Sequence, residues 1–206
     1  IISATAQYNQ GHGLRLEDAG HVVVTGTLLA HNARGYGIWT ADNATSVVLQ
    51  DNVVADNAYA AHLPLDHQVM DTIWTDNRVN QIALVGGDLP KTSTWAAPIP
   101  YRVDADVIVG ASQAVSLTLV PGARLLFGEG RQLVIEQNGI LSAVGTLTAP
   151  ITMERADPDA EWGGAARKLR YTSSCLSDDS GRFHRALPQL ASLQDHYHGS
   201  PYPGEQ

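Results

Sequence analysis

The chain is poor in cysteine, in basic residues and in long apolar runs. Cys175 is the single cysteine among 206 residues, so no disulfide can form within the chain. Thirteen lysines and arginines stand against 21 aspartates and glutamates, and the formal net charge of −8 would repel nucleic-acid backbones and anionic membrane surfaces. No apolar run reaches the ~18 residues that a membrane-spanning helix needs. We therefore expect no nucleic-acid partner and no membrane span. The charge is compatible with cations and neutral sugars as partners.

Two kinds of repeat run along the chain. Three similar hexapeptides start at Gly13, Gly37 and Ala61, a spacing of 24 (37 − 13 and 61 − 37). Residues two apart share one face of a strand. Apolar pairs of this kind recur in steps of 8 (125 − 117), and they are Leu117/Leu119, Leu125/Phe127, Leu133/Ile135 and Leu141/Ala143. Three such steps make 24, so the pattern predicts a β-solenoid with three strands per turn.

The periodicity divides the chain into four segments. Residues 1–87 and 101–164 carry the repeats and are predicted to form parallel β-helix turns. Residues 88–100 lose the period and contain three prolines, so we expect a linker or an enlarged loop there. Residues 165–206 show no sustained period of two, which predicts an irregular tail.

Asparagine recurs at a spacing of 25 in the first segment. Asn57 follows Asn32 at this spacing (57 − 32), and Asn77 follows Asn52 (77 − 52). Side-chain amides that are stacked in neighbouring turns can hydrogen-bond along a ladder. We expect both pairs to be structural.

Aspartates close the three hexapeptides and form a candidate site. In register, Asp18, Asp42 and Asp66 would stack about 4.8 Å apart, and Ca²⁺ would relieve the repulsion between them. The alternative is that each aspartate caps a bend by accepting a backbone hydrogen bond. A slip of one residue would instead align Glu17, Asp42 and His67.

Asp51 and Asp76 form a second candidate pair, because they too are spaced by 25 (76 − 51). Two carboxylates in adjacent turns could act as acid and base in glycoside cleavage, but any repeat with aspartate in its bend creates such pairs. Trp39 and Trp74 are candidate platforms for sugar rings, although alternation could turn either one inward. Known metal-ligand spacings and nucleotide-binding motifs are missing, so no transition-metal site is predicted.

Further motifs accompany the second repeat. They are Pro121-Gly122, Phe127 at a strand end, Gly145-Thr146, Pro150-Ile151 and Trp162-Gly163-Gly164. With these motifs residues 101–164 resemble bacterial right-handed parallel β-helix repeat proteins of the pectate-lyase-like superfold, and residues 1–87 resemble them more loosely. Met153 stands where the family usually has phenylalanine, and the family pattern does not continue after Gly164. The resemblance implies a right-handed fold and a secreted, periplasmic or cell-surface location.

The expectation from the sequence is an all-β, right-handed parallel β-helix with an irregular carboxy-terminal tail. We expect a non-catalytic repeat segment of an exported bacterial protein, part of a longer chain, whose flat faces bind a polysaccharide or a protein. The alternative is a carbohydrate-active enzyme, either a polysaccharide lyase or a glycoside hydrolase, with acidic residues along the first segment. No cofactor is expected, except that Ca²⁺ could bind at the aspartates.

Overall fold

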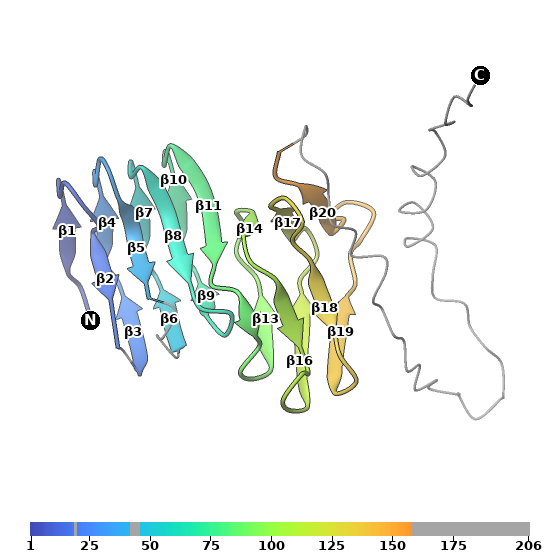
Figure 1. Ribbon diagram of the computed structural model, residues 1–206. Helices are drawn as coiled ribbons and strands as arrows, with labels where there is room; N and C mark the ends of the chain where they lie inside the picture. Colours follow the sequence, from blue (N-terminus) through green and yellow to red (C-terminus); the bar gives the residue numbers. More distant parts are fainter. Residues whose placement is uncertain (19, 42–45, 158–206) are drawn as a thin grey trace, which may run out of the picture. The chain divides into compact units, whose positions relative to one another are not determined.

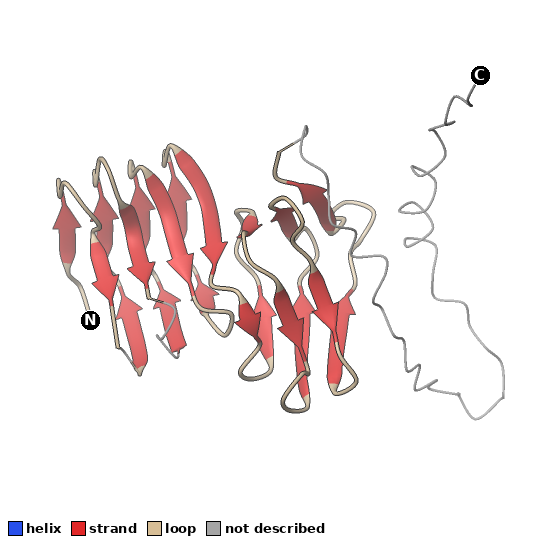
Figure 2. Cartoon of the chain, viewed as in Figure 1, coloured by secondary structure: helices blue, strands red, loops and turns tan. Residues whose placement is uncertain are grey.

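The computed structural model describes residues 1–18, 20–41 and 46–157. Every regular element in these residues is a β-strand (Figure 2), and the strands pair in parallel. They wind into a β-solenoid of about six turns (Figure 1). No described helix could span a membrane. The predicted all-β parallel solenoid is therefore confirmed, while the predicted tail and the Trp162-Gly163-Gly164 motif lie outside the described residues.

One sheet runs through the whole stack, and the other sheets cover part of it. The long sheet has seven strands, in the order β2 (Leu14–Leu16), β5 (Tyr36–Thr40), β8 (Tyr59–Leu63), β11 (Val79–Leu84), β14 (Tyr101–Val103), β17 (Arg124–Phe127) and β20 (Thr152–Arg155). In the amino-terminal turns the other two sides are a four-stranded sheet of β1 (Thr5–Gln7), β4 (Leu28–Ala30), β7 (Val53–Ala55) and β10 (Ile73–Thr75), and a three-stranded sheet of β3 (His21–Thr25), β6 (Ser46–Gln50) and β9 (Gln68–Met70). In the carboxy-terminal turns they are a three-stranded sheet of β12 (Gly87–Asp88), β15 (Val107–Val109) and β18 (Leu133–Ile135), and another of β13 (Ser93–Trp95), β16 (Val115–Leu119) and β19 (Gly139–Ala143).

The two repeat segments of the sequence share the seven-stranded sheet. β11 pairs with β14, and Ile82 lies beside Tyr101. The segment 88–100, for which we expected a linker or an enlarged loop, contains β13, which pairs with β16. The loss of periodicity between Gly86 and Pro100 therefore marks the place where the two shorter sides change from one pair of sheets to another.

Alternating apolar residues fill the interior of the stack. The apolar pairs that recur in steps of 8 (125 − 117) fall in four consecutive strands, β16 to β19, one pair on each successive side. Leu117, Leu125 and Phe127 are almost completely buried, and Leu117 lies beside Leu141 one turn later. The division of a turn into three strands is thus confirmed. The period of 24 holds between β16 and β19, whereas β15 pairs with β18 at an offset of 26 (133 − 107) and β17 pairs with β20 at an offset of 28 (152 − 124).

The amino-terminal turns vary in length, which changes the predicted register. Leu14 lies beside Ile38 at the expected offset of 24 (38 − 14), but Ile38 lies beside Ala61 at an offset of 23 (61 − 38). The next turn is shorter still, since Val53 pairs with Ile73 (73 − 53 = 20). A fixed spacing therefore aligns the wrong residues after the second turn.

A buried asparagine ladder stabilises one bend of these turns. The Nδ2 group of Asn32 donates to Oδ1 of Asn57 at 2.7 Å, and Nδ2 of Asn57 donates to Oδ1 of Asn77 at 2.9 Å. Asn9 continues the ladder in the first turn, donating to Oδ1 of Asn32 at 2.8 Å. The predicted stacking of Asn32 on Asn57 is confirmed. The predicted stacking of Asn52 on Asn77 is wrong, because the shortened turn brings Asn77 into the column of Asn57 instead.

Candidate functional site

The predicted carboxylates Asp18, Asp51 and Asp76 occupy bends with left-handed backbone, at φ values of 49°, 52° and 54°. Aspartate tolerates this conformation better than most residues, which explains why it recurs after strands. The Asp51 N–H donates to the Met70 carbonyl, so its neighbour along the axis is Asp71. Asp76 follows the strand that pairs with Val53–Ala55 and lies one turn from Asp56. The predicted pair of Asp51 with Asp76 is therefore wrong, since the two residues occupy different corners.

Asp66 and His67 lie in a buried cluster. Asp66 Oδ2 lies 3.0 Å from Lys91 Nζ, which also donates to Ser46 Oγ at 3.1 Å. The His67 Nδ1–H donates to the Pro64 carbonyl at 2.7 Å. Burial lowers the pKa of His67 to about 4, so the ring is neutral near pH 7. These contacts give Asp66 and His67 a structural role at the point where the sheets change.

The predicted column of Asp18, Asp42 and Asp66 cannot be followed through its middle member, since Asp42 lies outside the described residues. Within the described part of the chain, no group of three histidine, cysteine, aspartate or glutamate side chains is arranged to hold a metal ion. Asp18, Asp51 and Asp76 therefore lie in bends. Asp66 is the partner of Lys91 in an ion pair.

The outer surface of the seven-stranded sheet carries a different cluster, which we call the aromatic face: His12, Tyr36, Trp39, Tyr59 and His62. Tyr36 stacks on Tyr59 with ring centroids 4.9 Å apart. Trp39 stacks on His62 at 5.8 Å, and His12 stacks on Trp39 at 5.5 Å. The rings follow the turn spacing because β5 and β8 are paired in register, with Tyr36 beside Tyr59 and Trp39 beside His62.

Backbone packing beneath the aromatic face explains its sequence. Gly37 follows the outward-facing Tyr36 and is itself buried. A Cβ there would lie 2.5 Å from Cγ1 of Val54 and 2.8 Å from Nδ2 of Asn57, so only glycine fits above this part of the core and the asparagine ladder. The Tyr36 N–H donates to Nδ1 of His12 at 3.1 Å. Burial, then the neighbouring Arg15 and His62, lower the pKa of His12, which suits a neutral ring that accepts this bond.

Two arginines cover rings of the aromatic face. The guanidinium carbon of Arg15 lies 5.1 Å from the centroid of the Trp39 ring, and that of Arg78 lies 5.7 Å from the centroid of Tyr59. Both distances suit cation–π attraction. The Trp39 ring is thus already in contact with Arg15 and His62. The prediction of Trp74 as a second platform is wrong, because Trp74 is only 8% exposed and packs in the core.

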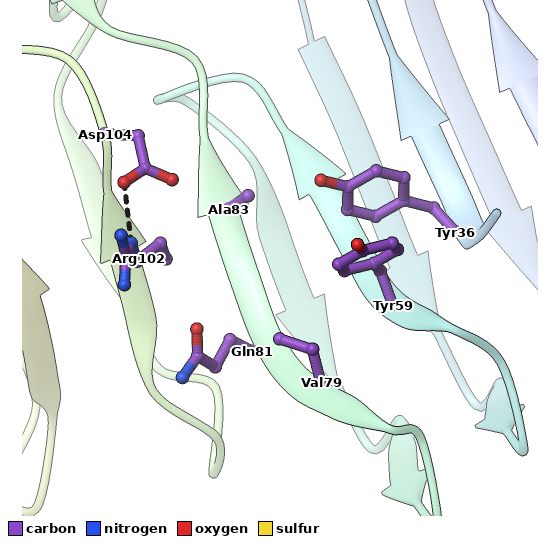
Figure 3. A pocket seen from close by; sticks show the side chains of 7 residues that line it. All are labelled: Tyr36, Tyr59, Val79, Gln81, Ala83, Arg102 and Asp104. Carbon is purple, nitrogen blue, oxygen red and sulfur yellow. Dashed lines mark hydrogen bonds and ion pairs between the residues drawn. The ribbon is translucent and has the colours of Figure 1, made fainter. Parts of the chain in front are cut away.

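A surface depression of about 170 Å³ lies beside the aromatic face. Figure 3 shows Tyr36 and Tyr59 on one side, Arg102 and Asp104 on the other, and the side chains of β11 between them. These β11 residues are Val79, Gln81 and Ala83.

The charged groups of the depression compensate one another. Nε of Arg102 donates to Oδ1 of Asp104 at 2.6 Å. Burial, then Tyr59 and Asp104, raise the pKa of Tyr36, so its hydroxyl stays protonated at neutral pH. The depression therefore combines tyrosine rings with hydrogen-bond donors and acceptors, as a ligand rich in hydroxyl groups requires.

A second groove, between β9 and β13, has a volume of about 330 Å³. Its lining has no ring and no charged group, and consists of Gln68, Val69, Met70, Thr92, Ser93, Thr94 and Ala96. Of the two, the smaller depression is the better candidate for specific recognition, because it offers orienting charges and aromatic surface.

The tyrosines of this site were not among the residues predicted from the sequence. Tyr36 and Tyr59, like Trp39 and His62, stand at a spacing of 23 (59 − 36 and 62 − 39), so a search at that spacing would have found both columns.

Comparisons of the chain with models of protein families, with curated proteins and with solved structures found no match.

Proposed function

We propose that the chain is a non-catalytic segment of a right-handed parallel β-helix protein that binds glycans through its seven-stranded sheet. The resemblance of residues 101–164 to bacterial β-helix repeat proteins supports the handedness and an origin in an exported bacterial protein. On this proposal the segment acts outside the cytoplasm, in the periplasm, at the cell surface or in the medium, where polysaccharides are found.

The main support for the proposal is the depression beside the aromatic face. Sugars combine apolar C–H surfaces with hydroxyl groups, and the depression offers Tyr36 and Tyr59 together with the polar groups of Gln81, Arg102 and Asp104. The neighbouring stacked rings and paired strands hold the walls in place without ligand, which reduces the ordering cost of binding.

Binding without turnover fits the position of the carboxylates. Asp66 is buried and paired with Lys91, and Asp51 and Asp76 lie at separate corners. Glycoside hydrolysis by a retaining or an inverting mechanism needs two carboxyl groups within about 10 Å on either side of the bond that is cleaved. The lining of the depression contains one carboxylate, Asp104, which is bound to Arg102.

Affinity electrophoresis tests the proposal. The chain is run in native gels that contain galactomannan, hydroxyethylcellulose or polygalacturonate, each with Ca²⁺ and with a chelator, and the same mixtures are assayed for new reducing ends. We expect retardation without new reducing ends, and Tyr59→Ala should abolish the retardation. Tyr8→Ala is the matched control, because Tyr8 is an exposed tyrosine that stacks on His31 outside the depression. Unchanged migration in every gel would contradict glycan binding, and product formation would contradict the non-catalytic assignment.

A further inference from the structure

The outward side chains of the seven-stranded sheet form columns along the axis, and both columns of the aromatic face are interrupted at β11. One column runs from Tyr36 to Tyr59 and then to Val79. Each of the first two positions carries a ring, and the third carries a small apolar side chain.

The second column is interrupted at the same strand. It runs from Trp39 to His62, then to Ala83, and continues with Arg102. Ala83 therefore separates a ring from a guanidinium group. The depression exists because β11 supplies no ring between the aromatic strands and β14.

The width of this gap can be worked out from the strand spacing. β8, which carries Tyr59, and β14, which carries Arg102, lie on either side of β11, and neighbouring strands are about 4.8 Å apart, so these two backbones are roughly 10 Å apart across the sheet. A flat aromatic ring in contact with both walls would need only about 7 to 8 Å, because carbon atoms make contact at ~3.5 to 4.0 Å. A pyranose ring in its chair form is thicker, since its carbon atoms are staggered and carry hydrogens on both faces. A gap of this width therefore has room for a saturated sugar ring.

The charges of the depression favour a neutral sugar. Asp104 already compensates Arg102, and the whole chain has a net charge of −8, so a carboxylated sugar would meet repulsion. Gln81 offers both a donor and an acceptor, Asp104 accepts and Arg102 donates. Hydroxyl groups, which donate and accept, match this set without leaving a charge unpaired.

We propose that the depression binds one neutral hexopyranose unit of a glycan, held between the Tyr36–Tyr59 wall and the Arg102–Asp104 wall over Ala83. This proposal rests on the proposed function, which it narrows to a ligand class and a position. The sugar ring takes the place of the missing ring in the columns, and its hydroxyl groups bond to Gln81, Arg102 and Asp104.

Filling the gap with a ring of the protein's own tests the proposal. Ala83→Trp would place an indole over β11 and should weaken the binding of galactomannan or hydroxyethylcellulose at least about tenfold, as measured by affinity electrophoresis. The matched control is Thr118→Trp, which introduces the same ring at a half-buried outward position of β16, in another sheet. Native-like binding by Ala83→Trp would overturn the proposal.

Two further variants keep the test decisive if Ala83→Trp does not fold. Tyr59→Leu removes the ring but keeps an apolar side chain, and Asp104→Asn removes the charge but keeps the shape. Each should weaken binding of the neutral polysaccharide about tenfold, and unchanged binding by both would overturn the proposal.

The outcomes separate this proposal from the broader one. Retardation of the native chain by polygalacturonate alone would overturn the neutral sugar and leave glycan binding intact. Retardation by neutral polysaccharides that survives Ala83→Trp would overturn the position and also leave glycan binding intact. No retardation by any polysaccharide would overturn both proposals.

Discussion

Replacing Asn57 by alanine should destabilise the fold strongly, because the Asn57 side chain makes four buried hydrogen bonds. Its Nδ2 group donates to the Leu29 carbonyl and to Asn77 Oδ1, each at 2.9 Å. Its Oδ1 accepts from the Asn32 backbone N–H at 3.1 Å and from Asn32 Nδ2 at 2.7 Å. Asn57 itself is 2% exposed, so water cannot replace these bonds without a rearrangement.

The magnitude follows from the groups that lose their partner. Asn57→Ala leaves the Asn32 N–H and the Leu29 carbonyl without their bonds to this side chain, in a part of the core where both residues are almost completely buried. A buried hydrogen bond contributes about 0.5–1.5 kcal/mol, so the loss of the four bonds of Asn57 should lower the free energy of unfolding by about 2–6 kcal/mol. A domain of this size has about 5–15 kcal/mol in total, so the effect should be easy to measure.

Urea denaturation followed by circular dichroism measures the loss, with Asn9→Ala as the control. Asn9 is exposed at the end of the same ladder, where its side-chain amide donates to Asn32 Oδ1. We expect Asn9→Ala to cost less than about 1 kcal/mol. If Asn57→Ala were no more destabilising than Asn9→Ala, the buried ladder would not stabilise the solenoid as described.

Three further predictions concern buried and strained positions. Burial lowers the pKa of His67 from 6.5 to about 4, so the unfolded chain takes up a proton at higher pH than the folded chain does. The free energy of unfolding should therefore fall by about 3 kcal/mol as the pH drops from 6.5 to 4. The urea midpoint of His67→Asn should lack this part of the pH dependence. Lys91→Met should cost about 1–3 kcal/mol of unfolding free energy, since it leaves the buried Asp66 carboxylate without its cation, and adding Asp66→Asn should restore part of the loss. Gly110→Ala should prevent stable folding, as judged by thermal melting, because its Cβ would collide with the backbone of the neighbouring turn, whereas Gly130→Ala, also at positive φ but in open space, should cost only about 1 kcal/mol; equal melting temperatures for the two variants would refute the packing argument.

The fold could be predicted from the sequence where one turn keeps a constant length. The pairs from Leu117/Leu119 to Leu141/Ala143 repeat in steps of 8 (125 − 117), and the structure places them on successive sides. The turn that ends in β10 is shorter, so spacing alone aligned Asn52 with Asn77, although the hydrogen bonds join Asn77 to Asn57. Turn length depends on how each bend packs, and that information is spread over the neighbouring turns rather than held in the local sequence.

The candidate site was harder to predict than the fold. The aspartates were predicted as site residues because they recur, but Asp51 and Asp76 recur because their bends need a residue that tolerates positive φ. The depression depends on the absence of a ring at Ala83 between His62 and Arg102, and these three residues become neighbours only once the register of β8, β11 and β14 is known. A small residue in a strand gives no signal of a binding site by itself.

Mapping the bound sugar by NMR tests the central claim most directly. The native chain, labelled with ¹⁵N, is titrated with a neutral oligosaccharide prepared from the polysaccharide that retards it in gels. The account predicts amide shifts confined to β5, β8, β11 and β14, centred on Tyr59, Ala83 and Arg102, which line the depression. Shifts centred on another sheet, or no shifts at saturating sugar, would contradict it.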